Sequence, residues 1–129
     1  MVVLMRALIA LSACLAFVGA LPPVQAPEHE PQVQMVDVSA ERFTFTPSQI
    51  KTTVGTTLRI RLRSDDTTHG FHIVGTGASI EIPKRGNDAA TVDFTPEHAG
   101  RYEFQCSKLC GAGHAFMRGV IVVKDAAER

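Results

Sequence analysis

Residues 106–117, CSKLCGAGHAFM, bring two thiols, an imidazole and a thioether into twelve positions of a 129-residue chain. The side chains belong to Cys106, Cys110, His114 and Met117. These soft and borderline ligands together favour copper, because zinc rarely accepts methionine and iron–sulfur clusters usually need more cysteines than this stretch holds. The stretch therefore predicts a copper site on one segment of the chain.

A disulfide is the main alternative from the residues alone, because an exported protein can oxidise a close pair of cysteines. A bond between Cys106 and Cys110 would close a very small loop and would add little stability. It would also leave His114 and Met117 without a role. Both interpretations stay open on these residues, and copper is the preferred one.

A further metal ligand is expected from residues 64–74, SDDTTHGFHIV, which hold two histidines. His69 and His72 differ by an odd number of positions, so on a strand they face opposite ways. His69 shares its face with Phe71 and Ile73, and that apolar face should point to the core. We therefore prefer His69 as the ligand and expect His72 to orient a neighbouring group or to be exposed.

The rest of the chain is typical of short β-strands. In TLRIRLR, residues 57–63, apolar and basic residues alternate. This period of two indicates a half-buried antiparallel strand, with its arginines on a solvated face rather than in a binding stripe. Residues 95–100, TPEHAG, are expected to form a short helical turn. Further strands are predicted at 33–39, 42–46, 49–54, 71–74, 79–82, 90–94, 101–106 and 118–124.

Turn residues separate these strands, and no segment after residue 30 shows the apolar period of a helix. Several short strands joined by turns indicate an all-β sandwich or barrel. The predicted metal ligands then lie between the strands 101–106 and 118–124, on a loop held by a rigid sheet, where binding residues are common. Gly111 and Gly113 let that loop turn tightly between ligands.

The first 21 residues carry one charge, Arg6, followed by fifteen uncharged residues. At ~1.5 Å per residue these reach about 22 Å, short of the ~30 Å hydrocarbon core of a bilayer. Residues 1–21 are therefore interpreted as a signal peptide, with an uncleaved membrane anchor and a lipoprotein signal at Cys14 as alternatives. Each of these exports the domain. Residues 22–34, with four prolines, are predicted to be a linker, and 35–125 the folded domain.

The charge composition excludes one class of partner. The chain has 13 basic and 13 acidic residues, so its formal net charge is zero, and no block of like charges interrupts it. Nucleic acid is therefore not expected as a ligand.

Two motifs together resemble a known family. The pattern C-x3-C-G-x2-H-x2-M at residues 106–117, preceded by DDTTHGFHI at 65–73, resembles the CuA domain of subunit II of haem–copper respiratory oxidases. The similarity runs from Phe43 to Lys124. It implies a cupredoxin-like Greek-key β-sandwich that holds two copper ions.

The resemblance also implies a role for each ligand. The two cysteine thiolates bridge both ions, each ion takes one histidine, and a thioether and a backbone carbonyl are weak ligands. The implied ligands are His69, Cys106, Lys108, Cys110, His114 and Met117.

Such a centre implies electron transport. Single electrons would pass from a cytochrome c-like donor toward the haem of an oxidase core subunit, and we expect Phe71, Phe104 and Phe116 to form an apolar shell around the metal. The resemblance leaves open whether the chain is the electron-accepting subunit of an enzyme. It implies a periplasmic location, either soluble after signal cleavage or anchored to the inner membrane by the N-terminal segment.

Two departures from the family keep an alternative open. Lys108 stands where many oxidase subunits have a glutamate that helps to bind magnesium, so that magnesium site is in doubt here. The chain also has no tryptophan and so lacks the aromatic patch that receives electrons in many such subunits. The alternative is a free-standing periplasmic cupredoxin that stores or delivers copper.

Overall fold

The structure is a computed structural model in which residues 30–126 are described. The predicted leader and most of the predicted linker lie outside the described residues. Nine strands are present among residues 30–126, one for each predicted strand. They are β1 (Val33–Glu41), β2 (Thr44–Thr46), β3 (Gln49–Thr53), β4 (Thr57–Ser64), β5 (His69–Ile73), β6 (Ser79–Ile82), β7 (Ala90–Phe94), β8 (Gly100–Gln105) and β9 (Arg118–Lys124).

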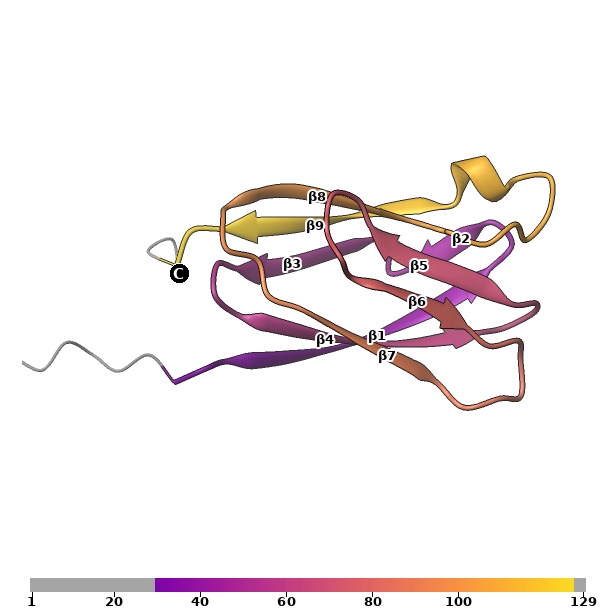
Figure 1. Ribbon diagram of the computed structural model, residues 1–129, viewed down its shortest axis with the longest axis horizontal. Coiled ribbons are helices and arrows are strands. Elements are labelled where there is room, and N and C mark those ends of the chain that lie inside the picture. The colour runs from indigo at the N-terminus through magenta and orange to yellow at the C-terminus, as the bar shows by residue number, and fades with distance from the viewer. Residues whose placement is uncertain (1–29, 127–129) are drawn as a thin grey trace, which may run out of the picture.

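The strands form two sheets that pack face to face (Figure 1). One sheet has the order β2-β1-β4-β7 and the other the order β3-β9-β8-β5-β6. Strand β4 pairs with β1 in parallel and with β7 antiparallel, and β3 pairs with β9 in parallel. The predicted all-β sandwich is confirmed. The predicted antiparallel pairing of the strand at 57–63 is confirmed with β7 and wrong with β1. Strands β2 and β3 lie between β1 and β4 in the chain, so β1 and β4 are not a hairpin and run in the same direction.

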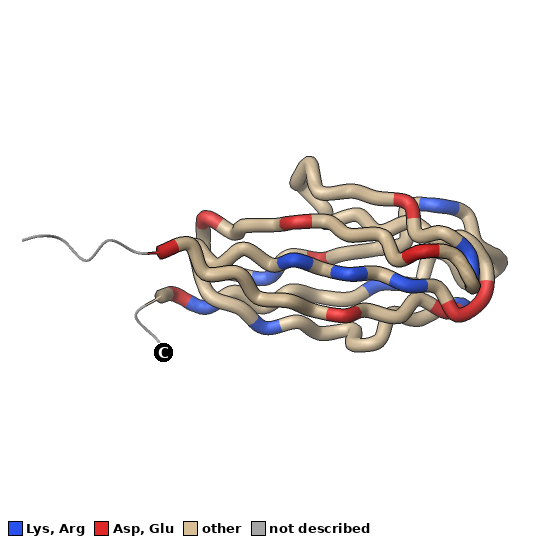
Figure 2. Tube along the Cα trace, turned by 90° about the horizontal axis from the view of Figure 1, so that it is seen from below, with Lys and Arg blue, Asp and Glu red and all other residues tan. Residues whose placement is uncertain are grey.

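The alternation along β4 separates the core from solvent as expected. Leu58, Ile60 and Leu62 are fully buried between the sheets. The arginines face outward, and two of them form ion pairs, Arg59–Asp93 and Arg61–Asp37. Figure 2 shows the basic positions in a row with acidic positions beside them. Exposed ion pairs of this kind contribute little to stability, so the row is the predicted solvated face.

Three phenylalanines join the two sheets at the centre of the core. Phe45 comes from β2, Phe71 from β5 and Phe104 from β8, and all three are almost completely buried. Their ring centroids lie 5.0–5.7 Å apart, with the Phe45 ring edge-on to the other two. Contacts of this geometry add to the stabilisation that comes from burying the rings.

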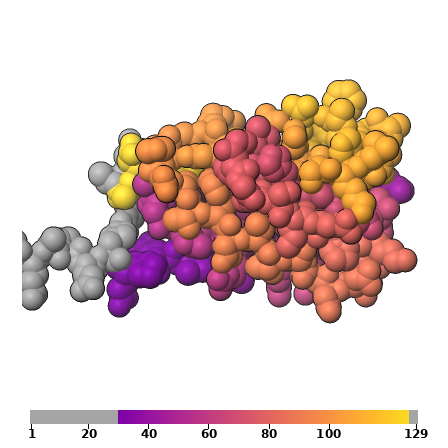
Figure 3. Space-filling model, in the orientation of Figure 1, coloured from indigo at the N-terminus to yellow at the C-terminus, as the bar shows by residue number. Residues whose placement is uncertain are grey.

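The metal-ligand segment lies at one end of the molecule. The start of β1 and the end of β9 lie together at the opposite end (Figure 1). In the space-filling view of Figure 3, the orange and yellow atoms of the segment after β8 lie at the upper right, at the end of the sandwich opposite the start of β1. Within residues 30–126, no helix is long and apolar enough to cross a membrane.

The expected helical turn at residues 95–100 is absent. Residues 97–99 form bends, and Gly100 begins β8. The Tyr102 hydroxyl donates a hydrogen bond of 3.0 Å to the His98 carbonyl. The pattern of residues 95–100 favours a helical turn, but this hydrogen bond from β8 stabilises a bend instead. The only helix among the described residues is a 3-10 turn, η1 (His114–Phe116), inside the metal-ligand segment.

The aromatic core gives a test of this fold. We expect Phe104→Ala to lower the free energy of unfolding of the metal-free chain by about 3–5 kcal/mol, because it opens a cavity between the sheets. Urea denaturation measures this change. Phe116→Ala is the control, because Phe116 is 83% exposed, and it should change stability by about 0.5 kcal/mol or less. Equal losses in the two variants would contradict the packing described here.

Candidate metal centre

Three strands and one loop position the predicted ligands. Cys106 directly follows β8, and Met117 directly precedes β9. The Cys106 amide donates to the Met117 carbonyl at 3.0 Å, which closes the base of the loop between them. We call residues 106–117 the metal loop. His69 is the first residue of β5, which lies beside β8 in the sheet.

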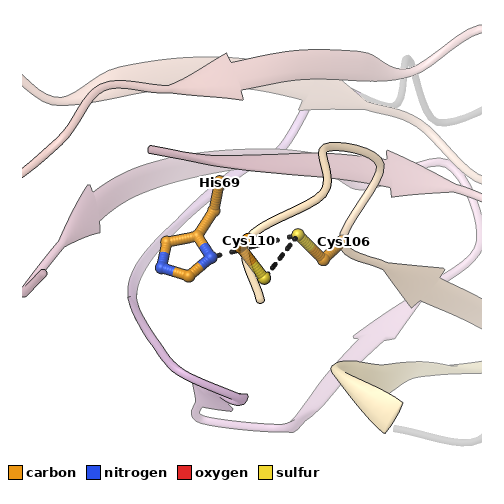
Figure 4. Close-up of side chains that lie close together, drawn as sticks. All are labelled: His69, Cys106 and Cys110. Atoms are coloured by element: carbon orange, nitrogen blue, oxygen red, sulfur yellow. Dashed lines mark hydrogen bonds between the residues drawn. The ribbon is translucent and has the colours of Figure 1, made fainter. Parts of the chain in front are cut away.

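The structure brings the two thiols and His69 into direct contact (Figure 4). The sulfurs of Cys106 and Cys110 are 3.7 Å apart, far beyond a disulfide bond length, and both cysteines are free. The Cys106 sulfur lies 3.9 Å from Nδ1 of His69. The ligand atoms of all three residues lie within 4.8 Å of one another. The predicted inward direction of His69 agrees with its complete burial.

The other three predicted ligands surround this pair of sulfurs. The Cys110 sulfur lies 3.8 Å from Nδ1 of His114 and 3.9 Å from the sulfur of Met117. The Cys106 thiol donates to the Lys108 carbonyl at 3.1 Å. All six predicted ligands therefore converge on one place. His72 lies on the opposite face of β5, half-buried, opposite Gln105 of β8.

The expected apolar shell is only partly present. Phe71 and Phe104 are completely buried in the core, whereas the Phe116 side chain is 83% exposed. The expectation that Phe116 shields the metal is wrong, because η1 turns this side chain outward. Leu109, which lies between Cys106 and Cys110 in the chain, is exposed as well.

Asp66 is a functional candidate that the sequence reasoning did not single out. One of its carboxylate oxygens lies 2.6 Å from Nε2 of His69. Partial burial would raise the pKa of Asp66. Its hydrogen bonds with His69 and with the backbone amides of Arg42 and Thr67 outweigh this effect and lower the pKa to about 2. The carboxylate fixes the ring of His69 from the side opposite Cys106. The D-x2-H spacing in DDTTH was the signal that could have identified it.

Two further contacts hold the metal loop against the body. A Cβ added at Gly70 would overlap Ser107 and lie 2.9 Å from the Lys108 amide. Gly70 therefore lets the metal loop lie directly on β5. The Lys108 ammonium pairs with Glu81 of β6 at 2.5 Å, so its side chain points away from the thiols while its carbonyl faces them.

The chemistry of this cluster fits a copper ion. Burial, followed by the hydrogen bond and charge of Cys106, raises the pKa of the Cys110 thiol to about 11. At neutral pH a thiol of this kind holds its proton until a metal cation displaces it. The cluster supplies two thiols, two imidazoles and a thioether, with almost no solvent reaching Cys106, Cys110 or Met117. Soft donors in an apolar surrounding are what copper prefers.

Replacing Asp66 tests the support of His69. We expect Asp66→Asn to lower the free energy of unfolding of the metal-free chain by about 1–2 kcal/mol near neutral pH. Because the folded pKa of Asp66 is about 2 and its ordinary value is 3.8, the stabilisation is complete above the ordinary value and is lost as pH falls toward the folded value. The two proteins should therefore converge in stability across that interval, which denaturation at a series of pH values measures. Asp65→Asn is the control, since Asp65 contacts Ser39 instead.

Comparisons with known proteins agree with this geometry. The family model of the cupredoxin-like domain matches residues 7–123. Two sequences of cytochrome c oxidase subunit 2 from Thermus thermophilus are each 35% identical over 95 residues, 74% of this chain. Those residues span 69% of the first relative and 55% of the second.

Solved structures share the fold at low sequence identity. The periplasmic domain of subunit II of cytochrome oxidase from Bradyrhizobium japonicum superposes with a TM-score of 0.64 at 19% identity, over 73% of this chain and 86% of that one. Auracyanin A, a blue copper protein from Chloroflexus aurantiacus, gives a TM-score of 0.60 at 18% identity, over 71% of this chain and 99% of auracyanin A. The chain therefore belongs to the cupredoxin-like domain family, and its resemblance to the CuA domain of cytochrome c oxidase subunit II is confirmed.

Proposed function

We propose that this protein is an exported electron carrier with a binuclear, CuA-type copper centre. Its proposed ligands are His69, Cys106, Lys108, Cys110, His114 and Met117. The observation that carries the proposal is the pair of unbonded, buried sulfurs 3.7 Å apart, each with a histidine nitrogen within 3.9 Å. A single-copper site needs only one thiolate, so the second facing thiol favours two ions.

Two copper ions held between these thiolates would supply a relay for one electron at a time. The chain's own residues limit what must move during each transfer. Cys106 and Met117 are fixed by the strands that they adjoin, and Asp66 holds the imidazole of His69. Phe71 and Phe104 keep the interior behind the centre free of water. Ligands fixed in this way shift little when the centre gains or loses an electron.

The proposed partners follow from the relatives. The Thermus proteins are named as subunit 2 of cytochrome c oxidase, and the Bradyrhizobium structure as the periplasmic domain of such a subunit. We infer a cytochrome c-like donor, a haem–copper oxidase core as acceptor and an extracytoplasmic location, with the N-terminal segment as signal or membrane anchor. A chain in this role contributes to the oxidase reaction by accepting electrons rather than by catalysing a step alone.

A second candidate is a free-standing protein that stores or delivers copper. The observation that favours it is the ion pair between Lys108 and Glu81, because Lys108 stands where many oxidase subunits have a glutamate that helps to bind magnesium. Transfer of copper(I) from the loaded chain to a competing chelator within minutes would support this function. Repeated, reversible reduction and oxidation with the copper retained would support the electron carrier.

Copper loading tests the number of ions. We expect the purified full chain, given equimolar copper(I) and copper(II) without oxygen, to bind two ions and to give an electron spin resonance spectrum split by two equivalent copper nuclei. Cys110→Ser should abolish that spectrum and leave at most one ion, because one thiolate cannot hold both ions in a bridge. Retention of a single ion with one-nucleus splitting in the unaltered chain would exclude the binuclear centre.

Met117→Leu tests the role of the thioether. We expect this variant to keep both ions and to raise the reduction potential, because a weak axial ligand tunes a copper site rather than builds it. Leucine fills a similar volume in this buried position, so the fold should tolerate it. Spectroelectrochemistry measures the potential, and metal analysis the stoichiometry. Loss of both ions would show that Met117 is instead a principal ligand.

A further inference from the structure

The turn between β1 and β2 contacts the metal loop through two adjacent residues. The Arg42 Nε donates a hydrogen bond of 2.8 Å to the Cys110 carbonyl, which is 68 positions away in the chain. The ring of Phe43 lies so close to Gly113 that a Cβ on that glycine would overlap it. The metal loop is therefore held at a second place, separate from its contact with β5 at Gly70.

Arg42 also reaches the support of His69. Its backbone amide donates to one carboxylate oxygen of Asp66 at 3.0 Å, and its Nε lies 4.0 Å from the same oxygen. The other oxygen of Asp66 lies 2.6 Å from Nε2 of His69. One residue thus connects the carbonyl of Cys110 with the carboxylate that orients His69.

We propose that Arg42 is a positioning residue of the thiol–imidazole cluster, which fixes Cys110 and His69 relative to each other and places a permanent positive charge beside them. The role as part of a copper centre rests on the function proposed above. A guanidinium suits this position because it is planar, always charged and able to serve two acceptors at once. Lysine offers the charge without that fixed fork.

Replacing Arg42 should disturb the metal loop without lowering the stability of the whole fold. The side chain of Arg42 is 51% exposed, and an exposed ion pair contributes little to the stability of the whole fold. The metal loop, by contrast, has no strand partner between Cys106 and Met117 and depends on contacts of this kind for its order.

Arg118 provides a matched control on the other side of the metal loop. Its Nε donates to the Ala115 carbonyl at 2.9 Å, and its Nη1 pairs with Glu103 at 3.1 Å. The side chain of Arg118 is 53% exposed, close to the value for Arg42. The two residues therefore match in charge, in exposure and in the kinds of contact that they make. Neither of its side-chain acceptors belongs to a predicted metal ligand or to Asp66.

The first measurement uses the metal-free full chain. We expect Arg42→Met to raise amide hydrogen exchange about tenfold in residues 107–115 while the strands stay protected, because the loop loses a charge-assisted bond. Arg118→Met should raise it about twofold or less in the same residues, because the bond from Arg118 to Ala115 spans only three residues and does not tie the loop to a distant part of the chain. The exchange rate of these residues in Arg42→Lys should lie between the rates in Arg42→Met and in the unaltered chain. If Arg42→Met loses the fold, Arg42→Gln gives the same comparison with a neutral donor retained.

The second measurement uses the chain loaded with equimolar copper(I) and copper(II). Loss of a positive charge stabilises the more positive oxidised state. We therefore expect Arg42→Met to lower the reduction equilibrium constant about tenfold against a fixed mediator, which is ~59 mV for one electron. The copper hyperfine splitting should change with it, because Cys110 and His69 move. Arg42→Lys should restore the potential but not the splitting.

The two measurements separate this proposal from the proposed function. Arg42 is not a positioning residue if Arg42→Met leaves loop exchange unchanged, or if Arg118→Met changes exchange and potential equally. If the unaltered chain takes up no copper while Arg42→Met still loosens the metal loop, the electron-carrier function fails and the positioning role of Arg42 stands.

Discussion

The sulfurs of Cys106 and Cys110 lie 3.7 Å apart in a space that solvent hardly reaches. The surrounding structure holds them in this position. Burial makes the ionised form of a thiol costly, as the raised pKa of Cys110 shows. The Cys110 thiol therefore becomes a thiolate readily only when a cation compensates its charge. The same burial that keeps this thiol protonated favours a metal cation as its partner.

The metal loop is held at three places. A hydrogen bond between its own end residues, Cys106 and Met117, closes its base beside β8 and β9, and β5 supports it at Gly70. The turn after β1, in the other sheet, supports it at Cys110 and Gly113. Because the sheets share one packed core around Phe45, Phe71 and Phe104, the three supports cannot move independently.

Charge is arranged differently near the cluster and on the outer sheet face. On β4 the arginines pair with aspartates on neighbouring strands, and these pairs are exposed to water, where they have little effect. Near the cluster, Asp66 has several hydrogen bonds, and its low pKa keeps it ionised at any physiological pH. A carboxylate held in this way can orient an imidazole permanently, which an exposed carboxylate in a mobile ion pair does not do.

The sequence by itself determined the strands, the inward direction of His69 and the collection of ligands on one loop. These properties depend on the period of apolar residues and on spacing within short segments, both of which are local. Tertiary structure decided the parallel pairing of β1 with β4 and the contact of Arg42 with Cys110. Those depend on how segments distant in the chain meet, and no local pattern encodes the distance between residues 42 and 110.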